Sequence, residues 1–299
     1  MADSPAERSA RRALDERALG HVLQRLQRAP APPWLHAEVA RRMAERLPVI
    51  KLQPAVVLDW WSQLGSSQDV LRRAYPQARI VAVETDAPAV AELPWWSPKR
   101  WGSQAVPPVA EAAVAAGGAQ LVWANMMLHG AIDPQAVMQR WARALAVDGF
   151  LMFSTLGPGT FERLSALYRA QGWPPPFAPF VDMHDLGDML VHAGFADPVM
   201  DQEPVTLTWP DAGALLADLR ALGGNVDPRR HAGLRTPRWR ERLLQALAAT
   251  AGADGRLSLQ VELVYGHAFR PLPRPRLAAT TEVPLADLQA MARSGRKPR

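Results

Sequence analysis

Cysteine is absent from the 299 residues of the chain. This absence excludes a disulfide framework, a thiolate nucleophile and a metal centre ligated by cysteine. Long apolar runs are also missing, because no stretch approaches the roughly 18 residues needed for a membrane-spanning helix. The N-terminal segment from Met1 to Arg12 is polar and charged, so we expect no secretory signal. Together these absences predict a cytoplasmic protein with no membrane partner.

Excess charge is scarce outside the C-terminal end of the chain. The net charge is +5 and the isoelectric point is about 10.2, but segment 271–299 holds six basic and two acidic residues. The remaining body is therefore close to neutral. This argues against a nucleic-acid partner, since a duplex-binding face needs several phosphate contacts. We interpret 271–299 as a basic disordered tail.

Apolar periodicity divides the rest of the chain into alternating strands and helices. Short apolar runs predict buried parallel strands, and apolar residues recurring every three or four positions predict helices. The expected strands cover 55–59, 79–84, 119–125, 150–154, 205–209 and 257–269. The expected helices cover 34–47, 67–75, 134–145, 160–170, 184–193 and 211–222, with Thr160 as the N-cap of the fourth.

This order of elements predicts an α/β fold with a doubly wound, mostly parallel sheet. The last strand alternates with period two, which is typical of an antiparallel strand with one exposed face. Asp59 and Glu84 close the first two strands, near the spacing of about 20 residues expected for a ribose-binding carboxylate. We divide the chain into a helical extension with a proline-rich linker (1–33), the main domain (34–270) and the tail (271–299).

Three segments resemble one family of enzymes. They are the strand and loop from Val57 to Gly65, the strand and loop from Val122 to His129, and the strand, turn and helix from Phe153 to Leu164. These segments resemble the malonyl-acyl carrier protein O-methyltransferases of biotin synthesis. The resemblance implies a class I methyltransferase fold with a seven-stranded sheet. It also implies S-adenosylmethionine as cofactor and a malonyl group on acyl carrier protein as methyl acceptor.

The same resemblance assigns four residues to cofactor binding, namely Asp59, Gly65, Glu84 and Asn125. Glu84 would accept hydrogen bonds from the ribose hydroxyls, since a carboxylate can serve two donors at once. Asn125 would bind the methionine moiety, and Asp59 would orient the loop or the methionine amino group. Local roles stay open for the last two, because Asp59 also suits a helix cap and Asn125 a turn.

Substrate contacts are expected from His129, Phe180, Arg229 and Arg230. His129 lies where a catalytic residue facing the substrate is expected, although a single histidine also suits a structural role. The arginine-rich segment 229–240 suits an acidic carrier protein or a malonyl carboxylate, or is simply a solvated face. A carboxylate is already ionised at neutral pH and needs no general base. No second ligand cluster accompanies His129, so we predict no metal.

The loop after the first strand departs from the family pattern. Trp61 and Gln63 stand where the family carries glycines, and only Gly65 remains. Glycines allow the backbone to approach a cofactor closely, whereas Trp61 could fill that space. An alternative function is therefore a non-catalytic binding protein of the same fold. A further alternative comes from segment 180–195, which resembles the methyltransferase-fold assembly factors of respiratory complex I, thought to hydroxylate an arginine.

Overall fold

The computed structural model describes residues 11–85 and 107–272. Their strands form one seven-stranded sheet in the order β3-β2-β1-β4-β5-β7-β6. The strands are β1 (Val56–Trp60), β2 (Arg79–Glu84), β3 (Val109–Ala110), β4 (Ala119–Ala124), β5 (Leu145–Leu156), β6 (Ala196–Trp209) and β7 (Leu257–Phe269). β1 to β5 pair in parallel, whereas β7 runs antiparallel to both β5 and β6. The predicted mostly parallel, doubly wound sheet is confirmed.

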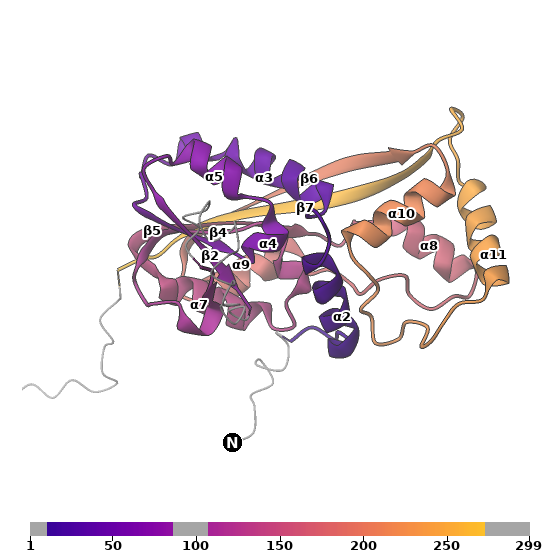
Figure 1. The fold of residues 1–299 in the computed structure, drawn as a ribbon, viewed down its shortest axis with the longest axis horizontal. Coiled ribbons are helices and arrows are strands. Elements are labelled where there is room, and N and C mark those ends of the chain that lie inside the picture. Colours follow the sequence, from indigo (N-terminus) through magenta and orange to yellow (C-terminus); the bar gives the residue numbers. More distant parts are fainter. Residues whose placement is uncertain (1–10, 86–106, 273–299) are drawn as a thin grey trace, which may run out of the picture.

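Helices cover both faces of this sheet. They are α2 (Glu16–Gln27), α3 (Trp34–Ala44), α4 (Ser62–Gly65), α5 (Gln68–Ala74), α7 (Pro134–Ala144), α8 (Glu162–Ala170), α9 (Met183–His192), α10 (Ala212–Leu222) and α11 (Pro237–Ala248), with short 3-10 turns η1 (Leu47–Val49), η2 (Glu111–Ala113) and η3 (Leu128–Gly130). α3 and α5 lie over one face and α7 over the other (Figure 1). β6 and β7 extend toward a separate group formed by α8, α10 and α11.

The sheet is buried between two apolar layers. On the α3 side, Val57, Leu121 and Phe150 pack in one cluster; on the α7 side, Leu58 and Val122 pack in a second. Successive residues of a strand point to opposite faces, so a strand covered on both sides appears in the sequence as a continuous apolar run. This is why the central parallel strands were predictable.

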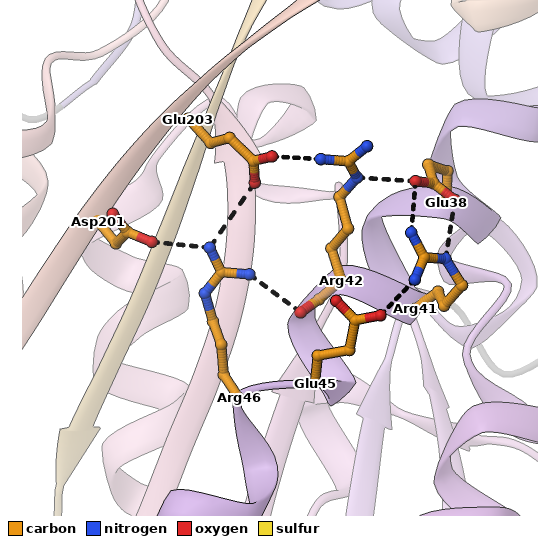
Figure 2. Close-up of polar contacts among 7 residues, drawn as sticks. All are labelled: Glu38, Arg41, Arg42, Glu45, Arg46, Asp201 and Glu203. Carbon is orange, nitrogen blue, oxygen red and sulfur yellow. Dashed lines mark hydrogen bonds and ion pairs between the residues drawn. The ribbon is translucent and has the colours of Figure 1, made fainter.

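α3 is fixed to the edge of the sheet by an ionic network (Figure 2). Arg46 Nη2 pairs with Asp201 on β6 at 2.7 Å, and Arg42 pairs with Glu203 on the same strand. The Arg46 guanidinium also lies 3.9 Å from the centre of the Tyr265 ring on β7. Hydrogen bonds from Arg41, together with those from Arg42, lower the pKa of Glu38 to about 2. The network holds α3 and the turn after it against β6 and β7. His36, on α3, lines the larger cavity described below.

Several elements differ from the sequence predictions. β6 begins at Ala196, well before the predicted start at 205, and β5 extends beyond 150–154 at both ends. Thr160 is not the N-cap of α8; Phe161 occupies that position in left-handed backbone, and the Thr160 hydroxyl donates to the Glu262 carbonyl. β3 and α11 were not predicted.

The N-terminal region packs onto the main domain. α2 begins at the capping carboxylate of Asp15, and the Arg25 guanidinium donates to the Arg220 carbonyl at 2.8 Å. Residues 1–10 and nearly all of the predicted tail, 273–299, lie outside the described part, so the three-part division of the chain stays a prediction. Among the described residues, no helix is both long and apolar enough to cross a bilayer.

Candidate functional site

The carboxyl ends of β1, β2 and β4 meet at one edge of the sheet. In doubly wound folds, ligands bind in the crevice outside these ends, where the strand order reverses. In this sheet β1 pairs with β2 on one side and with β4 on the other, so the reversal lies at β1. Asp59, Glu84 and Asn125, predicted from the sequence as cofactor-binding residues, all lie at this edge.

Two buried carboxyl groups lie at these strand ends. Glu84 Oε1 accepts a hydrogen bond from the Gln63 backbone N–H, at 2.9 Å, at the start of α4. Asp59 Oδ2 accepts from the Ser62 hydroxyl, whereas its Oδ1 has no partner among the described residues. Burial raises the pKa of each group to about 7, and the charge of Glu84 contributes to the shift at Asp59.

Asn125 joins three segments around the end of β4. Its Nδ2 donates to the carbonyls of His36, at 2.8 Å, and Gly65, at 2.6 Å, and its Oδ1 accepts from the Ser154 hydroxyl at 2.7 Å. The amide is fully buried. A side chain on Gly65 would meet the Ser67 hydroxyl at 3.2 Å, so this glycine allows close packing of the loop against Asn125 and Ser67. Asn125 and Gly65 therefore hold the loop after β1 against the end of β4.

Trp61 lies at the same strand ends. It adopts left-handed backbone, with φ 53°, directly after β1. Its indole Nε1 donates to Glu111 Oε1 at 2.6 Å, and its ring packs against Gly130, where an added Cβ would lie 3.4 Å from Cζ3. Glu111 follows β3 and Gly130 follows β4. The indole therefore lies across the strand ends, where doubly wound folds bind ligands.

Glu111 holds the indole in place. The same Oε1 also accepts from the Trp60 indole at 2.8 Å, and Oε2 lies 3.1 Å from Nε of Arg140 on α7. Hydrogen bonds to an ionised acceptor are about twice as strong as those between neutral groups. The sequence analysis did not single out Glu111, because it lies 50 residues from Trp61 and follows a strand of only two residues.

An apolar cavity of about 570 Å³ opens beside the indole. Trp61, Met127 and Gly130 form its wall at the strand ends, and residues of α2, α8 and α10 enclose the opposite side. A second cavity of about 510 Å³ shares Arg12 and Phe180 with the first. Asp59, Glu84 and Asn125 do not line either cavity, whereas Trp61 lines the larger one.

His129 and Phe180 both lie on the wall of the larger cavity. Their rings pack edge to face with centres 6.2 Å apart. Burial, with the neighbouring His36 and Arg12, lowers the pKa of His129 to about 3, so its imidazole is neutral at physiological pH. Its Nδ1 has no partner in the described chain. A neutral imidazole can exchange hydrogen bonds with a substrate but cannot bind a carboxylate by charge.

The two arginines predicted to bind substrate already have carboxylate partners. Arg229 pairs with Asp227 at 2.9 Å, and Arg230 pairs with Asp15 at 2.6 Å. Arg229 lines the second cavity, whereas Arg230 lines neither. The structure instead brings Arg12 to the larger cavity. The sequence contains no local signal for this position, because Arg12 lies in a polar terminal segment and meets residues more than 100 positions away.

The buried carboxyl of Asp59 predicts how Asp59→Asn changes the pH dependence of stability. Its pKa is about 7 in the folded state and 3.8 ordinarily, so the folded state holds a proton that the unfolded state releases between these values. The contribution of Asp59 to stability is therefore fully present below about pH 4 and is lost as pH rises through about 7. The free energy of unfolding of Asp59→Asn should rise relative to the wild type by about 2 kcal/mol from pH ~5 to pH ~8.

Urea unfolding of both proteins at the two pH values measures this difference. His36 and His129 have lowered pKa values and impose the opposite slope, but they are common to both proteins and cancel in the comparison. A difference between the variant and the wild type that stays constant with pH would contradict a protonated Asp59 in the folded state.

The fold and the crevice at the strand ends define the class of protein. A methyltransferase-fold chain from Bacillus halodurans, assigned provisionally as a methyltransferase, superposes with a TM-score of 0.50 at 14% identity, over 77% of this chain and 98% of that one. At this identity the likeness shows the fold alone. The chain therefore has the Rossmann-like class I methyltransferase fold. No family model matches the chain.

Curated relatives identify the family. The chain is 36% identical to a malonyl-[acyl-carrier protein] O-methyltransferase of Gallionella capsiferriformans, over 87% of this chain and 93% of that protein. It is 38% identical to the enzyme of the same name from Laribacter hongkongensis, over 81% and 84% of the two chains. The chain belongs to the malonyl-[acyl-carrier protein] O-methyltransferase family, which implies the use of S-adenosylmethionine.

The crevice fits that cofactor only in part. Asp59 Oδ1 is an acceptor without a partner among the described residues, and Glu84 ends β2 where a ribose would need a carboxylate. The indole of Trp61, however, also lies at the strand ends, where it packs against Gly130 and donates to Glu111. The polar groups suit the cofactor, whereas the indole lies at the strand ends where this fold binds its ligands.

Proposed function

We propose that the chain methylates the free carboxylate of a malonyl group carried by acyl carrier protein, using S-adenosylmethionine, and so serves biotin synthesis. One observation supports this assignment beyond family membership. The apolar cavity of about 570 Å³ reaches the strand ends at Trp61 and Gly130, next to the crevice in which this fold binds its ligands. An acyl chain in that cavity would direct its end toward the crevice.

The reaction requires the protein mainly to orient the carboxylate and to exclude water from the site. S-adenosylmethionine supplies, when bound, a methyl group on a sulfonium sulfur, and the bonding electron pair returns to sulfur as a carboxylate oxygen takes the methyl. No proton moves, so no general base is required. Holding the carboxylate in line and excluding water supplies the catalysis. The apolar walls formed by Phe161, Leu164 and Phe177 suit this purpose.

We assign the cofactor-binding roles to residues at the strand ends. Glu84 would accept hydrogen bonds from the ribose, and Asn125 would position the loop that carries Gly65. Trp61 would leave Glu111 before the nucleoside enters. Such a requirement lowers the apparent affinity by the fraction of molecules with an open crevice. The relatives reported above carry methyltransferase names, which supports methyl transfer over the hydroxylase alternative.

Intact-mass measurement of malonyl-acyl carrier protein tests the proposal. After incubation with the purified protein and S-adenosylmethionine, the carrier should gain the mass of one methyl group in place of a proton. Acetyl-acyl carrier protein, which has no free carboxylate, is the matched control and should not change. An unchanged malonyl carrier, under conditions in which the protein remains folded, would contradict the proposal.

Trp61 also raises the alternative of a non-catalytic binding protein of the same fold, which the methyltransferase names of the relatives do not support. In that case the indole would be a permanent part of the core. The wild type would then bind no S-adenosylmethionine in a calorimetric titration and would leave malonyl-acyl carrier protein unmodified. Cofactor binding by the wild type, at any measurable affinity, separates the enzyme from the scaffold.

A further inference from the structure

Arg12 is a partly buried cation with no carboxylate partner among the described residues. Its Nη1 donates to the His129 carbonyl, and its Nη2 donates to the Pro179 carbonyl at 2.8 Å. A guanidinium has five N–H donors, so donors remain for another acceptor. Burial lowers the pKa of Arg12 to about 10, which leaves the group fully charged at neutral pH.

Arg12 lines both cavities, and the smaller one also includes Asp182, Asp185 and Asp227. The larger cavity contains positive charge and, among the described residues, no acidic side chain. Its lining residues include Arg12, Arg25 and Arg220, and no aspartate or glutamate. The remaining wall is largely aliphatic and aromatic. A desolvated cation without a counter-ion is unfavourable in such surroundings, because burial removes its hydration. An anionic group on a bound ligand would compensate that charge.

Arg12 is better placed for this role than the other arginines near the cavities. Arg229 and Arg230 are neutralised by Asp227 and Asp15. Arg25 donates to the carbonyls of Arg220 and Gly223 near the end of α10. Arg12 instead contacts the backbone of His129, in the turn that follows β4, and so lies on the side of the cavity near the crevice.

We propose that Arg12 binds the free carboxylate of the acyl thioester substrate and thereby selects a dicarboxylic monothioester over an uncharged acyl thioester. The inference rests on the proposed function and adds the residue that recognises the acceptor. Backbone carbonyls of His129 and Pro179 fix the plane of the guanidinium, which leaves a fork for a carboxylate. A bidentate pair uses one lone pair of each carboxylate oxygen, and a remaining lone pair can take the methyl group.

Binding of substrate analogues without a methyl donor tests the role of Arg12. Calorimetric titration of the full chain with malonyl-pantetheine and acetyl-pantetheine gives the ratio of their affinities. The wild type should bind the malonyl compound about 10- to 100-fold more tightly, which is the ratio of affinities expected from one charge-assisted pair. Arg12→Gln should bind both compounds equally, and Arg12→Lys should retain part of the preference because it keeps the charge but not the fork.

Arg25→Gln is the matched control, because it removes an arginine from the same cavity wall. It should keep the preference of the wild type, and thermal melting should show that all variants are folded. A malonyl preference that survives in Arg12→Gln would overturn the inference while leaving the proposed function intact. If the preference depends on Arg12 but malonyl-acyl carrier protein is never methylated, the proposed function fails and the carboxylate site stands.

Discussion

Replacing Trp61 with glycine should tighten the binding of S-adenosylmethionine by roughly 10-fold to 100-fold. The indole lies at the strand ends and donates to Glu111 at 2.6 Å, so ligand entry into the wild type must break that bond and relocate the ring. Trp61→Gly removes both requirements. Glycine also adopts the observed φ of 53° without steric cost. Isothermal titration of the two proteins measures the change directly.

Two further variants show whether the effect belongs to this indole. Trp61→Phe keeps a ring in the crevice but lacks the N–H donor, so its affinity should lie between those of the wild type and Trp61→Gly. Trp34→Ala changes a tryptophan that is 45% exposed on α3 and should leave binding unchanged. Equal affinities of Trp61→Gly and the wild type would show that the indole does not compete with the cofactor.

Replacing Glu84 with glutamine should weaken S-adenosylmethionine binding about 100-fold without unfolding the protein. The proposed function assigns the carboxylate to the ribose hydroxyls, and an amide is a weaker acceptor that has only one oxygen to offer. The amide oxygen can still accept from the Gln63 N–H, so the start of α4 keeps its partner. Titration calorimetry of the variant, at the pH used for the wild type, gives the ratio of affinities.

Stability separates a lost ligand contact from a damaged fold in this experiment. Burial raises the pKa of Glu84 to about 7, so removing the carboxyl group should not lower the melting temperature at pH ~8, where the buried charge is unfavourable. Asp69→Asn serves as the control, because that side chain is 81% exposed on α5. Wild-type affinity in Glu84→Gln would exclude Glu84 as the ribose acceptor.

The sheet was largely predictable from the sequence, and its edge was not. Strands buried on both faces, such as Ala119–Ala124, appear as apolar runs with clear bounds. β6 forms the edge of the sheet, and its first half contains Pro198, Asp201 and Glu203 on positions that are half-buried or exposed. Edge strands tolerate proline and charge because one side makes no ladder hydrogen bonds. The polar half of β6 therefore gave no apolar signal.

The candidate site was predictable only where residues close strands. The family resemblance singled out Asp59, Glu84 and Asn125, and their places at the ends of parallel strands bring them to one edge of the sheet. Their roles stay predictions. Glu111 and Arg12 act through partners distant in sequence, the first through Trp61 and the second through His129 and Pro179. Such pairs depend on how elements pack, and neither periodicity nor local spacing records that packing.

A crystal structure with bound S-adenosylhomocysteine tests the central claim, which is that the nucleoside and the Trp61 indole compete for one space. The account predicts a ribose on the Glu84 carboxylate and an indole that has left Glu111. A nucleoside bound elsewhere, with the Trp61 Nε1 still on Glu111, would contradict it.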